Sequence, residues 1–180
     1  KFLVRNGVIA ATPIKNLALP KLGRRLPQHL TQRQMIDLLN APLKGLPTGN
    51  RKSPGRPISI AACYRDVAIL ETIYSCGLRI SELCGLLVED LDRGERLVRV
   101  RGKGKKERLI PIGEPALSAI QNYWRARPQT PAGHTPVFLG ETRRRAPLTP
   151  RQLQLRLKKY LALAGLDPKL TPHKLRHSYA

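Results

Sequence analysis

A glycine followed closely by an arginine interrupts the most apolar part of this chain, and this corner restricts the fold more than any other feature. The preceding run, residues 60–75, repeats apolar side chains at helical spacing, and Gly77 is expected to end that helix. A second apolar run begins near Ser81, so Arg79 is expected at a corner between two packed helices. An arginine fixed at such a corner is well placed to hold a phosphate.

The overall charge indicates a large anionic partner. Lysine and arginine number 33 against 12 acidic residues, which gives a formal net charge of +21. Nucleic acid is therefore the first candidate and an anionic membrane surface the second. The hydrophobic content of 41% predicts a folded domain rather than a basic tail. No apolar run approaches the roughly 20 residues of a spanning helix, and no signal peptide is visible, so a cytoplasmic location without a membrane partner is expected.

The cysteines and histidines do not suggest a metal or disulfide framework. Cys63, Cys76 and Cys84 lie in apolar segments without C-x-x-C spacing, so buried thiols in a reducing compartment are expected. His173 and His177 have the spacing of metal ligands on a helix, but no acidic third ligand is near them in the sequence. The G-x-x-x-x-G-K-[ST] motif of ATP-binding loops is also missing. We therefore expect no cofactor.

Periodicity predicts a mainly helical chain with a small antiparallel sheet, an α+β fold. Residues 96–101 and 107–112 alternate apolar with polar side chains and predict a hairpin whose tip is 102–106. The proline-rich basic stretch 12–27 predicts an extended linker, and 43–57 predicts a loop. Helices are expected at six places: 32–39, 60–75, from Ser81 onward, 114–127, from a Thr149 cap to Gly165, and over 173–180 after the start signal Thr171-Pro172.

Two further segments carry groups that could act on a phosphate. His173 and Arg176 share one face of an expected helix close to its N-terminus, where the helix dipole favours an anion. Lys103 lies at the hairpin tip, where it could donate a proton, and Lys105 and Lys106 have similar spacing. Each segment also has an ordinary interpretation. His173 could cap or pack while Arg176 forms a salt bridge, and a lysine turn could be a solvated hairpin end.

Together the three segments resemble a known pattern in order and spacing. The matching segments are G-L-R-I-S-E-L, R-G-K-G-K-K-E-R-L-I-P-I and T-P-H-K-L-R-H-S-Y-A. They are similar to the catalytic domain of the tyrosine recombinases, the phage integrase family, and in particular to its Xer branch. The linker L-P-K-L-G-R-R-L-P-Q-H-L-T resembles the strap between the core-binding and catalytic domains of that family. The resemblance covers about residues 14–180. It implies the end of a core-binding domain and a linker over 1–27, and a catalytic domain of the DNA breaking-rejoining fold, incomplete at its C-terminus, over 28–180.

The resemblance also implies roles for individual residues. Arg79 and Arg176 would clamp the scissile phosphate, His173 would assist proton transfer, and Lys103 would be the general acid for the leaving 5′-hydroxyl. Glu82 matches an acidic position behind the first arginine and would orient the site. The implied activity is site-specific recombination or integration of double-stranded DNA through a 3′-phosphotyrosine intermediate. A tetramer of protomers on two DNA sites would carry it out, without metal or ATP.

The chain departs from the family pattern at its end. The later His or Trp of the family and its tyrosine nucleophile follow the R-H-S segment, and Tyr179 is too close to Arg176 to be that nucleophile. Tyr179 is instead expected to be a core aromatic, and the chain as given is expected to bind DNA without cleaving it. The alternative from another class is a non-catalytic basic DNA-binding or architectural protein. A metal-dependent nuclease would need clustered acidic residues that the sequence does not contain.

Overall fold

The protein is described by a computed structural model, which covers residues 2–11, 30–44, 59–102, 107–127, 132–140, 146–172 and 175. Its helices are α1 (Phe2–Arg5), α2 (Gln32–Lys44), α3 (Ile60–Cys76), α4 (Ile80–Cys84), η1 (Val88–Asp90, a 3-10 helix), α5 (Glu114–Arg125) and α6 (Pro150–Leu163). The strands β1 (Leu91–Asp92), β2 (Leu97–Arg101) and β3 (Glu107–Pro111) form one antiparallel sheet in the order β1-β2-β3. The predicted fold class is confirmed.

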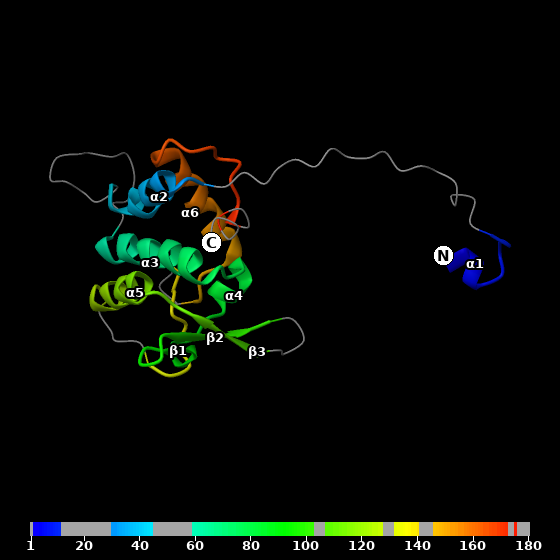
Figure 1. Ribbon diagram of the computed structural model, residues 1–180, viewed down its shortest axis with the longest axis horizontal. Coiled ribbons are helices and arrows are strands. Elements are labelled where there is room, and N and C mark those ends of the chain that lie inside the picture. Colours follow the sequence, from blue (N-terminus) through cyan, green and yellow to red (C-terminus); the bar gives the residue numbers. More distant parts are fainter. Residues whose placement is uncertain are drawn as a thin grey trace.

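Helix α3 is central to the described structure. It packs against α2 on one side and α5 on the other, and α6 contacts both α2 and α4 (Figure 1). Strand β3 contacts α3, which places the sheet beside the helices rather than between them. One hydrophobic core joins these elements and includes Ile69, Val98, Ile120, Phe138 and Leu161.

The corner between α3 and α4 forms as its sequence predicts. Gly77 adopts a left-handed conformation, with φ 55° and ψ 36°, and its N–H donates to the Ile73 carbonyl at 2.9 Å. A glycine in this conformation is a common way to end a helix. Leu78 and Leu83, on either side of Arg79, are fully buried. The core therefore fixes the backbone that carries Arg79.

We expect Gly77→Ala to lower the free energy of unfolding by about 1–2 kcal/mol, because an L-residue at positive φ brings its Cβ against the backbone. The matched control is Gly94→Ala, where φ is not positive and an added Cβ would lie 3.5 Å from the Asp92 Oδ1 atom, an ordinary contact. Urea denaturation of both variants measures the difference. Equal stability of the two variants would contradict this explanation of the corner.

Helix α2 is longer than predicted. The helix predicted over 32–39 continues to Lys44, with Pro42 inside. Pro42 lacks the N–H that would bond one turn back, so burial must compensate. Ala41 and Pro42 are both buried, and α2 packs against α3 and α6. Tertiary packing therefore outweighs the local cost of the proline.

Helix α6 buries fewer leucines than its sequence suggests. Leu153, Leu157 and Leu161 are buried at intervals of four residues, which is one face of a helix. Leu155 and Leu163 lie two residues from that row and are exposed. The predicted start is confirmed, because the Thr149 side chain accepts a hydrogen bond from the backbone N–H of the third helical residue.

The predicted hairpin is present, with a short strand added at its edge. Val98 pairs with Ile110, and Val100 pairs with Arg108, so these four side chains lie on the same face of the sheet. Val98 and Val100 are fully buried on that face. The added strand is β1, Leu91–Asp92, which pairs antiparallel with β2. The part of the predicted tip at 103–106 lies outside the described residues.

A buried ionic network connects α3 to α6. The Asp66 carboxylate, 2% exposed, accepts hydrogen bonds from Arg65 Nε at 2.8 Å, from Arg156 Nη1 at 2.7 Å and from the Tyr160 hydroxyl. Burial raises the pKa of Tyr160, and the Asp66 charge raises it further. Tyr160 is therefore a permanent donor to Asp66, and the carboxylate links three positive or polar groups from two helices.

All three cysteines are free and buried, as predicted. Burial raises the pKa of Cys76 and Cys84 to about 11 and also raises that of Cys63. In the part of the chain that the structure describes, no helix is both long and apolar enough to cross a membrane.

Candidate functional site

Arg79 occupies the position just before α4, with an extended backbone and a side chain that is 62% exposed. Its backbone N–H donates to Glu82 Oε2 at 2.9 Å, and its Nη1 donates to Glu82 Oε1 at 3.0 Å. A glutamate at the third helical position commonly turns back in this way to satisfy the unpaired N–H at the helix start. The sequence R-I-S-E therefore sets both the backbone and the guanidinium of Arg79.

Glu82 is the buried centre of this site. Its side chain is only 5% exposed, and it also accepts a bidentate pair from Arg108, with Nη1 to Oε1 at 3.0 Å and Nη2 to Oε2 at 2.8 Å. Each carboxylate oxygen thus accepts two hydrogen bonds. Burial acts to raise the pKa of Glu82, but the hydrogen bonds from Arg108 and Arg79 outweigh it and lower the pKa to about 2. Glu82 is therefore ionised throughout the physiological range.

The charge balance of this group suits an anion. Two guanidinium groups and one carboxylate leave one positive charge, and the more exposed of the two arginines is Arg79. A guanidinium has five N–H donors in a planar fork that matches the oxygens of a phosphate. Arg79 contacts Glu82 through Nη1, and its side chain is the more exposed part of the group. The group can therefore bind a phosphate at the α3–α4 corner.

Of the four predicted site residues, Arg79 is the one that the structure places. Lys103, His173 and Arg176 lie outside the described residues, as do Tyr179 and the linker 12–27. Their meeting around one phosphate stays a prediction. Also outside are residues 45–58, which make up most of the loop predicted at 43–57.

The helix start predicted before His173 is partly described. Pro172 and Leu175 have helical backbone, and the Leu175 N–H donates to the Thr171 carbonyl at 3.2 Å. Leu175 is fully buried in the core. The chain therefore begins to turn as a helix at Thr171, as its Thr-Pro start signal predicts.

The sequence analysis missed Arg108. Strand alternation places it on the same face as Ile110, which is the face that packs toward the helices. A charged residue on the apolar face of a strand was the available signal, because such a residue needs a buried partner of opposite charge. The partner is Glu82, 26 positions earlier in the sequence.

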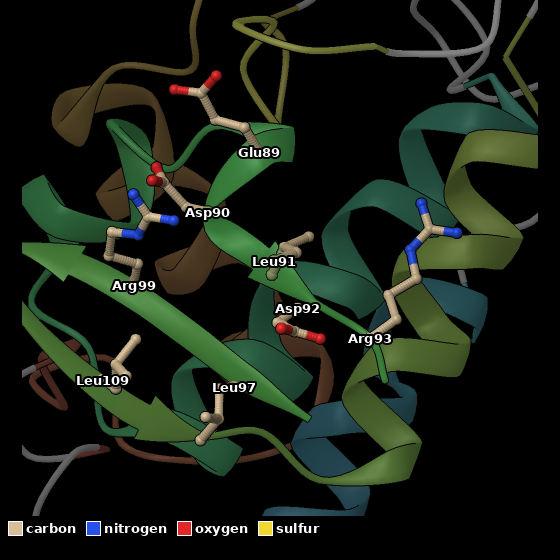
Figure 2. A pocket seen from close by; sticks show the side chains of 8 residues that line it. All are labelled: Glu89, Asp90, Leu91, Asp92, Arg93, Leu97, Arg99 and Leu109. Atoms are coloured by element: carbon tan, nitrogen blue, oxygen red, sulfur yellow. The ribbon is translucent and has the colours of Figure 1, made fainter. Parts of the chain in front are cut away.

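A cavity of about 610 Å³ lies beside η1 and the sheet, away from this group. Figure 2 shows its lining, in which three carboxylates outnumber two guanidiniums. Its lining residues are Glu89, Asp90, Leu91, Asp92, Arg93, Leu97, Arg99 and Leu109. Arg79 does not line it, and the carboxylates do not favour a phosphate there. Within the described ranges, no three His, Cys, Asp or Glu side chains are grouped so that they could hold a metal ion.

Comparison with known proteins identifies the class to which this fold and this arginine corner belong. The model of the phage integrase family matches residues 30–180. The chain therefore belongs to the phage integrase family, the tyrosine recombinases, as its three motifs indicated.

Relatives found by sequence include Xer recombinases. The chain is 39% identical over 180 residues to tyrosine recombinase XerC of Shewanella amazonensis, covering 100% of this chain and 55% of the relative. It is 37% identical over 182 residues to tyrosine recombinase XerD of Proteus mirabilis, covering 100% of this chain and 54% of the relative. The chain thus spans about half the length of the curated relatives it matches.

Solved structures with the same fold include two Xer recombinases. A XerH site-specific recombinase bound to a palindromic difH substrate matches with a TM-score of 0.70 and 22% identity, over 92% of this chain and 45% of that chain. The XerA recombinase matches with a TM-score of 0.66 and 23% identity, over 86% of this chain and 50% of that chain. At these identities the likeness establishes the fold alone.

Proposed function

We propose that the protein containing this chain is a site-specific recombinase that cuts and rejoins double-stranded DNA through a 3′-phosphotyrosine intermediate. Membership of the phage integrase family over residues 30–180 is the observation that carries this proposal. The named relatives are tyrosine recombinases, and the solved XerH structure holds a palindromic difH substrate. The exposed guanidinium of Arg79, held on a buried carboxylate, supplies a phosphate-binding group of the required kind.

The proposed chemistry is an exchange of phosphate esters. A tyrosine oxygen forms a bond to the scissile phosphorus, and the bond from phosphorus to the 5′ oxygen breaks. Negative charge that develops on the non-bridging oxygens is stabilised by Arg79 and Arg176, because preorganised bidentate donors bind the transition state more tightly than the ground state. Lys103 gives a proton to the leaving 5′ oxygen, and His173 assists proton transfer. The new ester conserves the energy of the old one, so the exchange needs no nucleotide hydrolysis.

The proposed organisation follows from the same family membership. Residues 1–27 would be the end of a core-binding domain and its linker, and 28–180 would be catalytic domain. The partner would be double-stranded DNA in the cytoplasm, held by a tetramer of protomers on two sites. The net charge of +21 supports a polyanionic partner.

Covalent trapping tests this function. The full-length protein that contains these residues would be incubated with nicked duplexes whose binding site has been selected from a random library. The nick releases a short product after cleavage, so rejoining is prevented and the protein stays attached to DNA. We expect an adduct that survives denaturing electrophoresis and disappears after protease treatment.

Tight binding without an adduct would contradict the proposal and would favour the non-catalytic DNA-binding alternative. Salt titration cannot make this distinction. Both functions predict that log affinity falls by about 0.9 per log unit of salt for each phosphate neutralised. The covalent bond is therefore the decisive measurement.

A further inference from the structure

The two arginines that contact Glu82 differ in the number of their side-chain contacts and in their exposure. Arg79 lies at the α3–α4 corner and uses Nη1 on the carboxylate, whereas Arg108 reaches it from β3 with two nitrogens, at 3.0 and 2.8 Å. The Arg79 side chain is 62% exposed and that of Arg108 is 36% exposed. Arg108, which makes two side-chain hydrogen bonds to Glu82, is thus the less exposed of the two arginines.

A buried carboxylate needs a full counter-charge. With a side chain 5% exposed, Glu82 has almost no water to solvate it, so its charge must be balanced by neighbouring donors. Among the described residues, the charged groups that face it are Arg79, from the start of α4, and Arg108, from β3. If Arg108 were absent, Arg79 would be the cation that remains on Glu82 among the residues that the structure describes, and its guanidinium would turn further onto the carboxylate.

We propose that Arg108 is a positioning residue, which neutralises Glu82 so that Arg79 keeps its guanidinium for the DNA phosphate. This role rests on the proposed function. Arg108 itself does not touch the phosphate in this arrangement. Its bidentate pair also fixes the rotation of the carboxylate, and this rotation determines where the Arg79 fork points.

The proposal predicts a defect in cleavage rather than in binding. We expect Arg108→Met in the full-length protein to slow adduct formation by about 10- to 100-fold, because small misplacement of a group that stabilises the transition state has effects of this size. The Kd for duplex DNA should change by less than about threefold, since one phosphate contact contributes little to the total. Arg125→Met is the matched control. It removes the same charge from the exposed end of α5, where Arg125 contacts Asn122, and should cleave at the wild-type rate.

The pH dependence separates positioning from a general loss of structure. Glu82 has a pKa of about 2, so it stays ionised in the wild type. In Arg108→Met the burial that raises its pKa remains, while the strongest contact that lowers it is lost. The carboxyl should then take up a proton as the pH falls and release Arg79. Because the uncharged carboxyl no longer holds Arg79, we expect the ratio of variant to wild-type cleavage rate to rise toward 1 as the pH is lowered.

Two further variants complete the test. Adding Glu82→Gln to Arg108→Met removes the titrating group, so the rate ratio should become independent of pH. Arg108→Lys restores the charge without the fork and should cleave at an intermediate rate. If Arg108→Met does not fold, as judged by circular dichroism, Arg108→Lys decides the question. An intermediate rate supports the role, and a wild-type rate overturns it.

The possible failures are distinguishable. If the wild-type protein forms no adduct, the proposed function is wrong and the role of Arg108 falls with it. If the wild type forms the adduct and Arg108→Met equals it, or if the rate ratio is flat with pH, the positioning role alone is wrong.

Discussion

Arg79→Ala is expected to reduce adduct formation by about 100- to 1000-fold in the full-length protein, because it removes a preorganised donor to the charge that develops on the phosphate. The corner that carries Arg79 is fixed by the buried Leu78 and Leu83, so the substitution should remove the side chain without moving the backbone. Arg108 still neutralises Glu82 in this variant, so no buried charge is left without a partner. Single-turnover cleavage of the trapped substrate measures the effect.

DNA binding gives the contrast for this variant. The affinity of Arg79→Ala for duplex DNA should fall by less than about tenfold, since many cations share the contacts with the backbone. Arg33→Ala, at an exposed position on α2, is the charge-matched control and should leave the cleavage rate unchanged. Wild-type cleavage by Arg79→Ala would refute the phosphate clamp. A parallel loss of binding and cleavage would assign Arg79 to binding rather than to the transition state.

Asp66→Ala is expected to lower the free energy of unfolding by about 3–5 kcal/mol, because it removes the buried carboxylate of an ion pair. The side chain of Arg65 is 3% exposed, so it would lose its carboxylate partner inside the protein. Arg156 and Tyr160 would lose the same acceptor, which joins α6 to α3. Denaturation in urea, followed by circular dichroism, measures the loss.

Two comparisons identify the cause of that loss. Tyr160→Phe removes one donor while the carboxylate keeps its arginines, so the cost should be about 1 kcal/mol. Glu95→Ala removes an exposed carboxylate from the turn before β2 and should change stability by less than about 0.5 kcal/mol. If Asp66→Ala were as stable as Glu95→Ala, the network would contribute specificity of packing rather than stability.

Local sequence signals predicted the corner between α3 and α4, but not the ion pair between Glu82 and Arg108 beside it. Gly77 and the apolar runs around it indicate two helices from residues that are close in sequence, and the structure confirms them. The bidentate pair between Glu82 and Arg108 joins a helix to a strand, and propensity says nothing about such a contact. The one sequence signal for this contact is strand alternation, which places Arg108 on the face of β3 that packs toward the helices.

Packing explains the remaining differences. Pro42 lies within a helix because the turn that contains it is buried, which is a tertiary effect. The sequence motifs also proposed Lys103, His173 and Arg176 as partners of Arg79. Their convergence depends on how segments about 25 to 100 positions apart are arranged, and it stays a prediction until those side chains are placed.

The state of the cysteines has a practical consequence for following the reaction. At neutral pH the thiols of Cys76 and Cys84 stay almost entirely protonated, and protonated thiols react slowly with maleimides. A new cysteine at an exposed position such as Leu155 can therefore take up a fluorophore while the native thiols stay unlabelled. Energy transfer between such dyes would then test the proposed assembly of protomers on DNA in real time, without a cysteine-free background.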